Sequence, residues 1–387
     1  MTTGRPSWCA PDPSDNPAGT DPGDASGRNS VTQTGLRIPP AIWRGQAADI
    51  LSAWGLPPDH AATTADVLTE ADLMGIESHG LAMLSLYERQ IQEGGANPQP
   101  EIRIVHDHAA VALIDADGGF GQTPSMLATQ MAGERAETFG IAAVAIRNSN
   151  HYGAAGIYAR RLAERGLIGW STSSVWRSAI VPTGGVEPRL GTNPIAFAAP
   201  CAGQRPFLLD MATSTAAIGK LKLAERAEKS IPAGWALDRQ GRPQLDPAAA
   251  LLDTLLVPLG GHKGYGLATM VEILSSTLSG AAMTPLRGTP AGRHDVGHFV
   301  MAIDPALLRG SRKAFEDDMA QMMDALRATP CFDESVPVMV AGDPEYRRED
   351  ERKAQGIPLP AKLGRQLRDV CERAGVPFVF EEEAVPG

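Results

Sequence analysis

The spacing of apolar positions divides the chain into a helical first part and a later part in which helices and strands alternate. Across residues 38–94, apolar residues recur three and four positions apart, which predicts helices with one buried face. The runs Glu101–Val105 and Ala110–Ile114 are rich in β-branched residues and predict two strands joined by a polar turn at residues 107–108. A sheet is therefore expected to begin after the helical part.

The rest of the chain predicts a series of short helices and strands. In chain order they are a helix at Met126–Phe139, a strand at Ile141–Arg147, a helix at Ala154–Arg165 closed by Gly166, strands at Leu167–Ser173, Ile195–Ala199 and Pro206–Leu209, a long helix through Leu267 and Leu278, a strand at His298–Ile303, helices at Lys313–Arg327 and Ala361–Ala374, and a last strand at Pro377–Phe380. This order is typical of an α/β fold.

Composition limits the kind of partner. The 387 residues include 43% hydrophobic ones, and 35 Lys+Arg against 45 Asp+Glu give a net charge of −10. This balance argues against binding to nucleic acid or to an anionic membrane surface and favours small metabolites. The longest apolar runs, such as Ile141–Ile146, are far shorter than the roughly 20 residues of a membrane helix.

The N-terminus and the cysteines suggest a location. Residues 1–36 are expected to be a disordered tail, because Met1–Ser30 is crowded with Pro, Gly, Asp and Ser. They show no basic stretch followed by an apolar core, as a secretory signal would. Four cysteines without a CxxC pair suggest a reducing cytoplasm rather than a disulfide framework.

Two histidines stand in polar segments beside glycine and are candidate proton carriers. His79 lies in ESHG and His151 in NSNHYG, where the backbone can approach a ligand closely. The alternative is that Ser78 and Asn150 cap helices and that the histidines are bystanders. The residues alone leave these two interpretations about equally good.

Glycine-rich segments offer a candidate anion site. Gly118–Gly121 fails the GxGxxG spacing, since Pro124 stands where the third glycine belongs, and no Walker A motif occurs. The segment PLGGHKGYG at 258–266 opens into an apolar helix and offers backbone N–H groups and Lys263 to a phosphate. A flexible loop with a solvated lysine is the alternative.

Asp210 ends an apolar strand, where a carboxylate could orient a histidine or bind a ribose hydroxyl. The alternative is that Thr213 or Ser214 in the same segment caps the next helix. A metal site is not expected, because His294 and His298 flank Gly297 at a strand start and do not share a helical face.

Taken together, these segments resemble the malate/L-lactate dehydrogenase family, which is distinct from the Rossmann lactate and malate dehydrogenases and includes ureidoglycolate, sulfolactate and cyclic-imine-reducing members. The matching pieces are ADLMGIESHG at 71–80, RNSNHYG at 147–153, PTGG at 182–185, LGTNPIAF at 190–197, LLDMATS at 208–214, GK at 219–220 and PLGGHKGYGLA at 258–268. The resemblance implies a non-Rossmann, mixed-sheet NAD(P)-binding domain at 116–304, and a helical domain built from 37–115 and a returning segment at 305–387. It also implies a homodimer that uses NAD or NADP.

The resemblance assigns roles residue by residue. His151 resembles the family's acid/base residue, Ser78 and His79 the pair that lines the substrate pocket, and Tyr87 an aromatic position beside them. The positions that resemble cofactor contacts are Ser174, Asp210, Met211, Ala212, Lys263, Gly342 and Arg347. The expected activity is hydride transfer between nicotinamide and a 2-hydroxy/2-oxo acid or a cyclic imino acid.

Met83 departs from the family pattern. Many members carry an arginine there, which can pair with a substrate carboxylate, whereas a methionine cannot. Simple malate or lactate are therefore doubtful substrates, and a bulkier or less charged one is favoured. The missing arginine also lends some weight to the alternative of a non-catalytic relative that binds a nucleotide or metabolite. A zinc enzyme that uses scattered histidines is a further rival.

Overall fold

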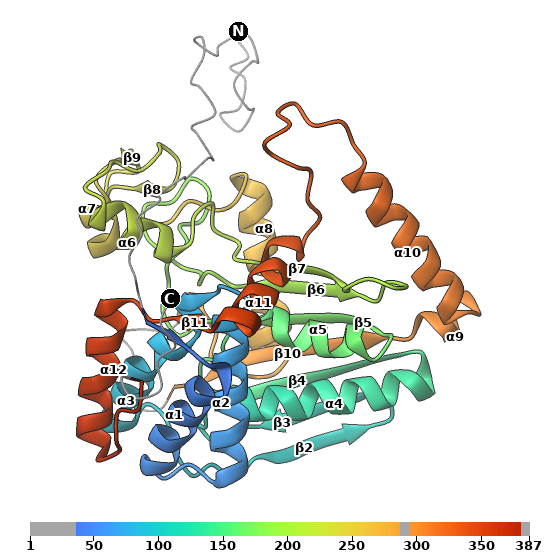
Figure 1. The fold of residues 1–387 in the computed structure, drawn as a ribbon, viewed down its shortest axis with the longest axis horizontal. Coiled ribbons are helices and arrows are strands. Elements are labelled where there is room, and N and C mark those ends of the chain that lie inside the picture. Colours follow the sequence, from blue (N-terminus) through green and yellow to red (C-terminus); the bar gives the residue numbers. More distant parts are fainter. Residues whose placement is uncertain (1–35, 287–293, 381–387) are drawn as a thin grey trace, which may run out of the picture. The chain divides into compact units, whose positions relative to one another are not determined.

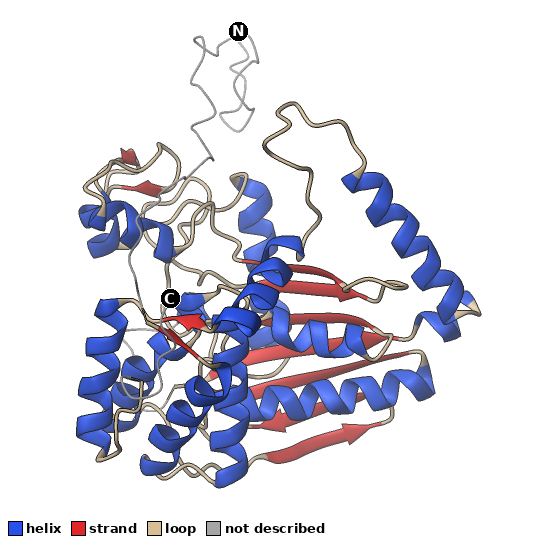
Figure 2. Cartoon of the chain, viewed as in Figure 1, coloured by secondary structure: helices blue, strands red, loops and turns tan. Residues whose placement is uncertain are grey.

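The computed structural model describes residues 36–286 and 294–380, so the expected tail lies almost wholly outside the described residues. Its centre is a seven-stranded sheet in the order β2-β3-β4-β10-β5-β6-β7 (Figures 1 and 2). The strands are β2 Arg103–His108, β3 Val111–Asp115, β4 Ile141–Ser149, β5 Ile168–Ser173, β6 Ile195–Ala199, β7 Phe207–Met211 and β10 Val296–Ile303. Only β3 and β4 pair in parallel, so the sheet is mixed, as expected.

Small apolar residues let helices lie close to one face of the sheet. Ala142, Val144 and Ile146 alternate along β4 and pack against the alanines of α4 (Gln122–Phe139). Helix α5 (Gly156–Glu164) covers the same face further along (Figure 1). On the opposite face the Thr172 and Ser275 hydroxyls lie 2.9 Å apart, which places the turn after α8 (His262–Glu272) there.

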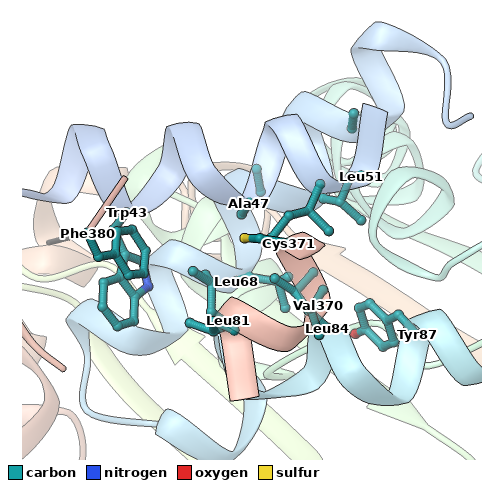
Figure 3. Close-up of a cluster of buried hydrophobic side chains, with 14 of the residues drawn as sticks. Trp43, Ala47, Leu51, Leu68, Leu81, Leu84, Tyr87, Val370, Cys371 and Phe380 are labelled. Carbon is teal, nitrogen blue, oxygen red and sulfur yellow. The ribbon is translucent and has the colours of Figure 1, made fainter. Parts of the chain in front are cut away.

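A helical core joins the two ends of the described chain. It is built by α1 (Pro40–Ala53), α2 (Pro58–Leu73), α3 (Leu84–Gln92) and α12 (Ala361–Ala374). Val370 and Cys371 of α12 pack among Ala47, Leu51 and Leu84 (Figure 3). The expected helical domain from N- and C-terminal segments is confirmed, while the boundaries at 115 and 304 stay predictions.

The remaining elements are short or peripheral. They are β1 Arg37–Ile38 paired with β11 Ile357–Pro358, α6 Ile218–Arg226, β8 Ala236–Leu237, β9 Pro243–Gln244, α7 Pro247–Asp253, α9 Pro305–Arg309, α10 Arg312–Arg327, α11 Asp343–Gln355, and 3-10 turns at Glu77–His79, Leu81–Met83 and Thr284–Leu286. Within the described ranges, no helix has both the length and the apolar character to cross a membrane.

Two local expectations are wrong. The chain does not turn at Asp107 and His108, because β2 runs through His108 and reverses at Ala109, whose φ is +47°. Pro377–Phe380 is no strand, since Gln46 satisfies this segment through bonds of 2.9 Å to Pro377 O and from Val379 N. Helix α11 begins at Asp343, with proline in its first turn and acidic residues at its N-terminus.

A buried ion cluster ties the helical part to the sheet. The Arg160 guanidinium of α5 lies 3.1 Å from Glu349 of α11, 2.8 Å from Glu164 and 3.5 Å from Glu70 of α2. The side chains of Arg160 and Glu349 are only 5% and 3% exposed. Three helices distant in sequence therefore meet on one cation.

Replacing this cation should destabilise the fold. In Arg160→Met the carboxylates of Glu349 and Glu70 lose their most buried partner and keep only the more exposed Arg161, Arg205 and Lys353, so we expect the free energy of unfolding to fall by about 1–3 kcal/mol. Urea denaturation measures this. In the control Arg189→Met, which breaks a surface pair with Glu187, the change should stay within about 0.5 kcal/mol. A loss for Arg160→Met no larger than that of the control contradicts the assignment.

Candidate active site

One edge of the sheet collects the ends of several strands. The register pairs Ser149 with Val296, Ser173 with His298, and Ile195 with Met211, so the carboxyl ends of β4, β5 and β7 meet there. The segments that carry His151, Ser174 and Asp210 to Ala212 therefore lie at the same edge. Ligands of open sheets gather at such an edge.

His151 follows β4 and is held through its Nδ1 atom. The Tyr87 hydroxyl of α3 lies 2.8 Å from Nδ1, and the Gly153 N–H donates to Nδ1 at 3.3 Å. Tyr87 in turn accepts a 2.7 Å hydrogen bond from the Gln122 side chain of α4. Since Gly153 can only donate, Nδ1 accepts, and the ring proton belongs on Nε2.

His79 lies directly beside His151. The two rings stack with centroids 5.3 Å apart and planes inclined by 25°. The Ser78 hydroxyl is 2.8 Å from His79 Nδ1. Loss of hydration lowers the pKa of His79 to about 4, and loss of hydration together with His79 lowers the pKa of His151 to about 3. Both imidazoles are therefore neutral near pH 7.

The capping interpretation of these segments is wrong. Neither Ser78 nor Asn150 donates to or accepts from a helix terminus as a cap. The Asn150 amide instead donates to Gly118 O at 2.8 Å and fixes the loop before α4. The structure thus brings Ser78, His79, Tyr87 and His151 together, as the sequence predicts.

Asp210 binds a helix N-terminus. Its Oδ2 accepts a 2.7 Å hydrogen bond from Gly156 N, the first residue of α5. Burial raises the pKa of Asp210 to about 6 against the effect of this bond, and nearby Glu345 raises it further. Thr213 and Ser214 donate to Thr192 O and Ala216 O rather than cap α6, so that alternative is wrong.

The other expected cofactor positions lie apart from the histidines. Ser174 is buried and its hydroxyl accepts from Gly297 N at 3.0 Å. Gly342 has φ +101° beside the edge strand β7, and Arg347 of α11 contacts the Met339 sulfur at 3.6 Å. Met211 and Ala212 end β7 and are half-buried. Among the described residues, no hydrogen bond or ion pair joins these side chains to His151.

Lys263 lies in the first turn of α8 after two left-handed glycines, Gly260 and Gly261. Residues 262–266 are helical, so the expectation of a flexible loop is wrong for them. The Lys263 side chain is exposed and forms no ion pair with any described carboxylate. A free ammonium beside backbone N–H groups suits an anionic ligand.

From the sequence, His298 was considered only as a metal ligand, yet it holds the backbone immediately before His151. Its Nε2 lies 3.0 Å from Asn150 O and its Nδ1 2.8 Å from the Ser173 hydroxyl, while its ring stacks on Tyr152 at 4.4 Å. A histidine within the apolar run of β10 was the available signal. Gln122 was missed too, because nothing local links it to Tyr87. In the described part of the chain, no three His, Cys, Asp or Glu side chains are placed to hold a metal ion.

Neutral, hydrogen-bonded histidines at the end of an α/β sheet can exchange protons with a small ligand. The site therefore places the protein among α/β proteins equipped for proton transfer. The family model for malate/L-lactate dehydrogenase matches residues 38–368. The chain therefore belongs to this family and is an oxidoreductase of it.

Several characterised relatives are similar over most of their length. Malate dehydrogenase of Pyrococcus horikoshii is 38% identical over 354 residues, 89% of this chain and 98% of that relative. A solved malate dehydrogenase structure from that organism superposes with a TM-score of 0.81 at 36% identity, covering 89% of this chain and 97% of its own. The (2R)-3-sulfolactate dehydrogenase (NADP(+)) of Chromohalobacter salexigens is 36% identical over 328 residues, 83% of this chain and 94% of the relative. The ureidoglycolate dehydrogenase (NAD(+)) of Escherichia coli O157:H7 is 35% identical over 313 residues, 79% and 87%.

The low pKa of His298 should appear in the pH dependence of stability. Burial lowers the pKa of His298 to about 3, so between that pH and about 6.5 the unfolded chain binds a proton that the folded chain does not. Acidification from pH 7 to 5 therefore favours unfolding, by on the order of 2 kcal/mol from this group alone.

His298→Gln keeps an N–H for Asn150 O but does not titrate. Between pH 7 and pH 5, the free energy of unfolding should therefore fall less in this variant than in the wild type, by on the order of 2 kcal/mol. Urea denaturation at the two pH values measures the difference. The exposed control His108→Gln should leave the pH dependence unchanged. Equal pH dependence in the wild type and His298→Gln contradicts the prediction.

Proposed function

We propose that the protein is an NAD(P)-dependent dehydrogenase or reductase that transfers hydride between nicotinamide and a 2-hydroxy/2-oxo acid or a related cyclic imino acid, with His151 as the acid/base residue. The observation that carries this proposal is the hydrogen bonding of His151, which leaves Nε2 unbonded to the rest of the described chain. A group in that position can exchange a proton with a substrate at the sheet edge.

The hydroxyl of Tyr87 supports both directions of the reaction. In reduction, Nε2–H of a protonated His151 gives its proton to the substrate oxygen or nitrogen, while Nδ1–H donates to the Tyr87 oxygen. In oxidation the neutral ring must instead carry its proton on Nδ1, where the Tyr87 oxygen accepts it, so that Nε2 can take the proton from the substrate. This is the other tautomer from the Nε2–H form that the contacts without substrate favour, and a hydroxyl that can both donate and accept permits both. A bound substrate carboxylate would raise the low pKa of His151 and favour the charged form that reduction needs.

A dinucleotide fits the residues of this edge. When bound, nicotinamide supplies or accepts the hydride. The unpaired Lys263 at the N-terminus of α8 suits its phosphates or ribose oxygens, and Ser174, Asp210, Met211, Ala212, Gly342 and Arg347 are the further positions proposed to hold it. Relatives whose names carry NAD(+) and NADP(+) are about equally similar, so either nucleotide is proposed.

Met83 is proposed to select the substrate. It lies one helical turn before Tyr87 and four residues after His79, half-buried at the edge of the helical core. An apolar thioether there offers no partner to a carboxylate.

Met83→Arg should therefore change the ranking of substrates. Malate carries a second carboxylate where ureidoglycolate carries an uncharged ureido group. We therefore expect the new guanidinium to improve kcat/KM for malate relative to ureidoglycolate about tenfold, since a charge-assisted pair contributes about 1.5–3 kcal/mol. Steady-state rates with malate, sulfolactate and ureidoglycolate measure the ranking, and Met83→Leu is the size-matched control. An unchanged ranking in Met83→Arg contradicts the proposed role.

The test of the acid/base role is His151→Ala. Cofactor affinity, measured by NADH or NADPH fluorescence, should stay near that of the wild type, while kcat should fall by the ~10²–10⁴-fold of a lost general acid/base. Equal loss of both would indicate a structural histidine. Cofactor binding without turnover in the wild type would favour the alternative function, a non-catalytic relative that binds nucleotide or metabolite.

A homodimer in the cytoplasm remains part of the proposal. Exposed apolar side chains support an interface with a second copy; they are Leu267 on α8, Ile273 and Leu278 in and after the π-helical turn that follows it, and Met322 and Leu326 on α10. Cys201, Cys331 and Cys371 are unpaired in the described ranges, which suits a reducing compartment.

A further inference from the structure

The segment that carries Ser78, His79 and Met83 has little regular structure of its own. We call Ile76–Met83, between α2 and α3, the pocket loop. It consists of two 3-10 turns closed by bonds such as His79 N to Ile76 O at 2.9 Å and Met83 N to Gly80 O at 2.9 Å. Such short turns need support from elsewhere to hold one geometry.

A buried carboxylate supplies this support. Asp72, near the end of α2, is 1% exposed, and its Oδ2 accepts 2.8 Å hydrogen bonds from Leu81 N of the pocket loop and from Trp43 Nε1 of α1. Leu81 and Trp43 are themselves fully buried in the helical core (Figure 3). Neighbouring Gly80 lies so close that a Cβ there would sit 1.9 Å from Asp72 Oδ1.

The charged groups around Asp72 come from the pocket loop and from α11. Arg352 of α11 donates to the backbone oxygen of Asp72 and, at 2.5 Å, to the Glu77 carboxylate. Burial raises the pKa of Asp72 to about 7, against its two hydrogen bonds, while Glu77 raises it and Arg352 lowers it. The carboxylate is therefore half protonated near neutral pH.

We propose that Asp72 is a positioning residue that anchors the pocket loop through Leu81 N and Trp43 Nε1, and so keeps His79 against His151. Its kinetic consequence rests on the proposed function, whereas the anchoring itself does not. Burial outweighs these hydrogen bonds in setting the pKa of Asp72. Opening of the loop would hydrate Asp72 and return its pKa toward the ordinary value of about 4, so opening releases a proton. The loop should consequently be held less firmly as the pH rises through 7.

Hydrogen exchange of the protein without substrate tests the anchor directly. After correction for intrinsic rates at pH 5.5, the Leu81 amide should exchange about tenfold faster in Asp72→Ala and within about threefold of the wild type in Asp72→Asn, which keeps an acceptor oxygen. Asp66→Ala removes an exposed carboxylate from the same helix and should change nothing at Leu81. Protection in α12 reports whether the helical core is intact.

The pH dependence keeps the proposal testable even if Asp72→Ala does not fold. At pH 5.5 the wild type should match Asp72→Asn at Leu81, because both present a neutral acceptor. At pH 8 the wild type should be the less protected, because opening then lets a buried carboxylate reach water, whereas Asn does not titrate. Two results would overturn the anchor. One is equal protection of the Leu81 amide in the wild type and Asp72→Asn at both pH values, and the other is equal protection in the wild type and Asp72→Ala.

Kinetics separate positioning from mere stability. With whichever of malate, sulfolactate and ureidoglycolate the wild type oxidises, folded Asp72→Ala should raise KM about tenfold, with NADH or NADPH affinity unchanged, and Asp72→Asn should restore it. An unchanged KM limits Asp72 to a structural role and overturns the positioning claim. If no substrate is turned over by the wild type, the proposed function fails while the exchange result still decides the anchor.

Discussion

The rest of the structure depends on one hydrogen-bonded chain, in which Gln122 donates to Tyr87 and the Tyr87 hydroxyl meets His151 Nδ1. Its members come from α4, from α3 and from the loop after β4, so it forms only when the helical part packs on the sheet. An imidazole oriented through one nitrogen presents the other in a defined direction, which is the requirement for proton transfer. The hydroxyl is suited to this place because it can both donate and accept.

The connections between the two parts of the fold serve the same requirement. Arg160 joins α2, α5 and α11 through three carboxylates. Arg352 of α11 reaches the end of α2 and the pocket loop. Buried charges of this kind add little net stability compared with apolar packing, but they tolerate few alternative arrangements. They fix how the loop with His79 meets the strand end with His151.

Much of the fold could be predicted from the sequence because its elements carry local signals. The strand expected at Ile141–Arg147 is β4, and the helices expected at Met126–Phe139 and Ala361–Ala374 are α4 and α12. Residues 377–380 show the limit of this reasoning. Their apolar pattern resembles a strand, but Phe380 is buried by stacking on Trp43 at 5.0 Å, and Gln46 replaces a strand partner.

The residues of the site also fall into two groups: those that local sequence motifs indicated, and those that only the fold brings together. Ser78, His79, Tyr87 and His151 stand in motifs that resemble those of a known family, and the structure brings them together. Gln122 and Asp72 bind partners on other helices, so no pattern around them indicated a role. His298 was signalled only by its place in the apolar run of β10, and its partners lie more than a hundred residues away in the sequence. The cofactor positions stay predictions, because their contacts within the chain do not distinguish a ligand site from an ordinary strand end or helix start.

The central claim is that this sheet edge binds a nicotinamide dinucleotide beside His151. Fluorescence titration of the purified protein with NADH and, separately, NADPH tests it most directly, since no knowledge of the substrate is needed. The account predicts saturable binding of at least one of the two in the micromolar range. Binding of neither would contradict it.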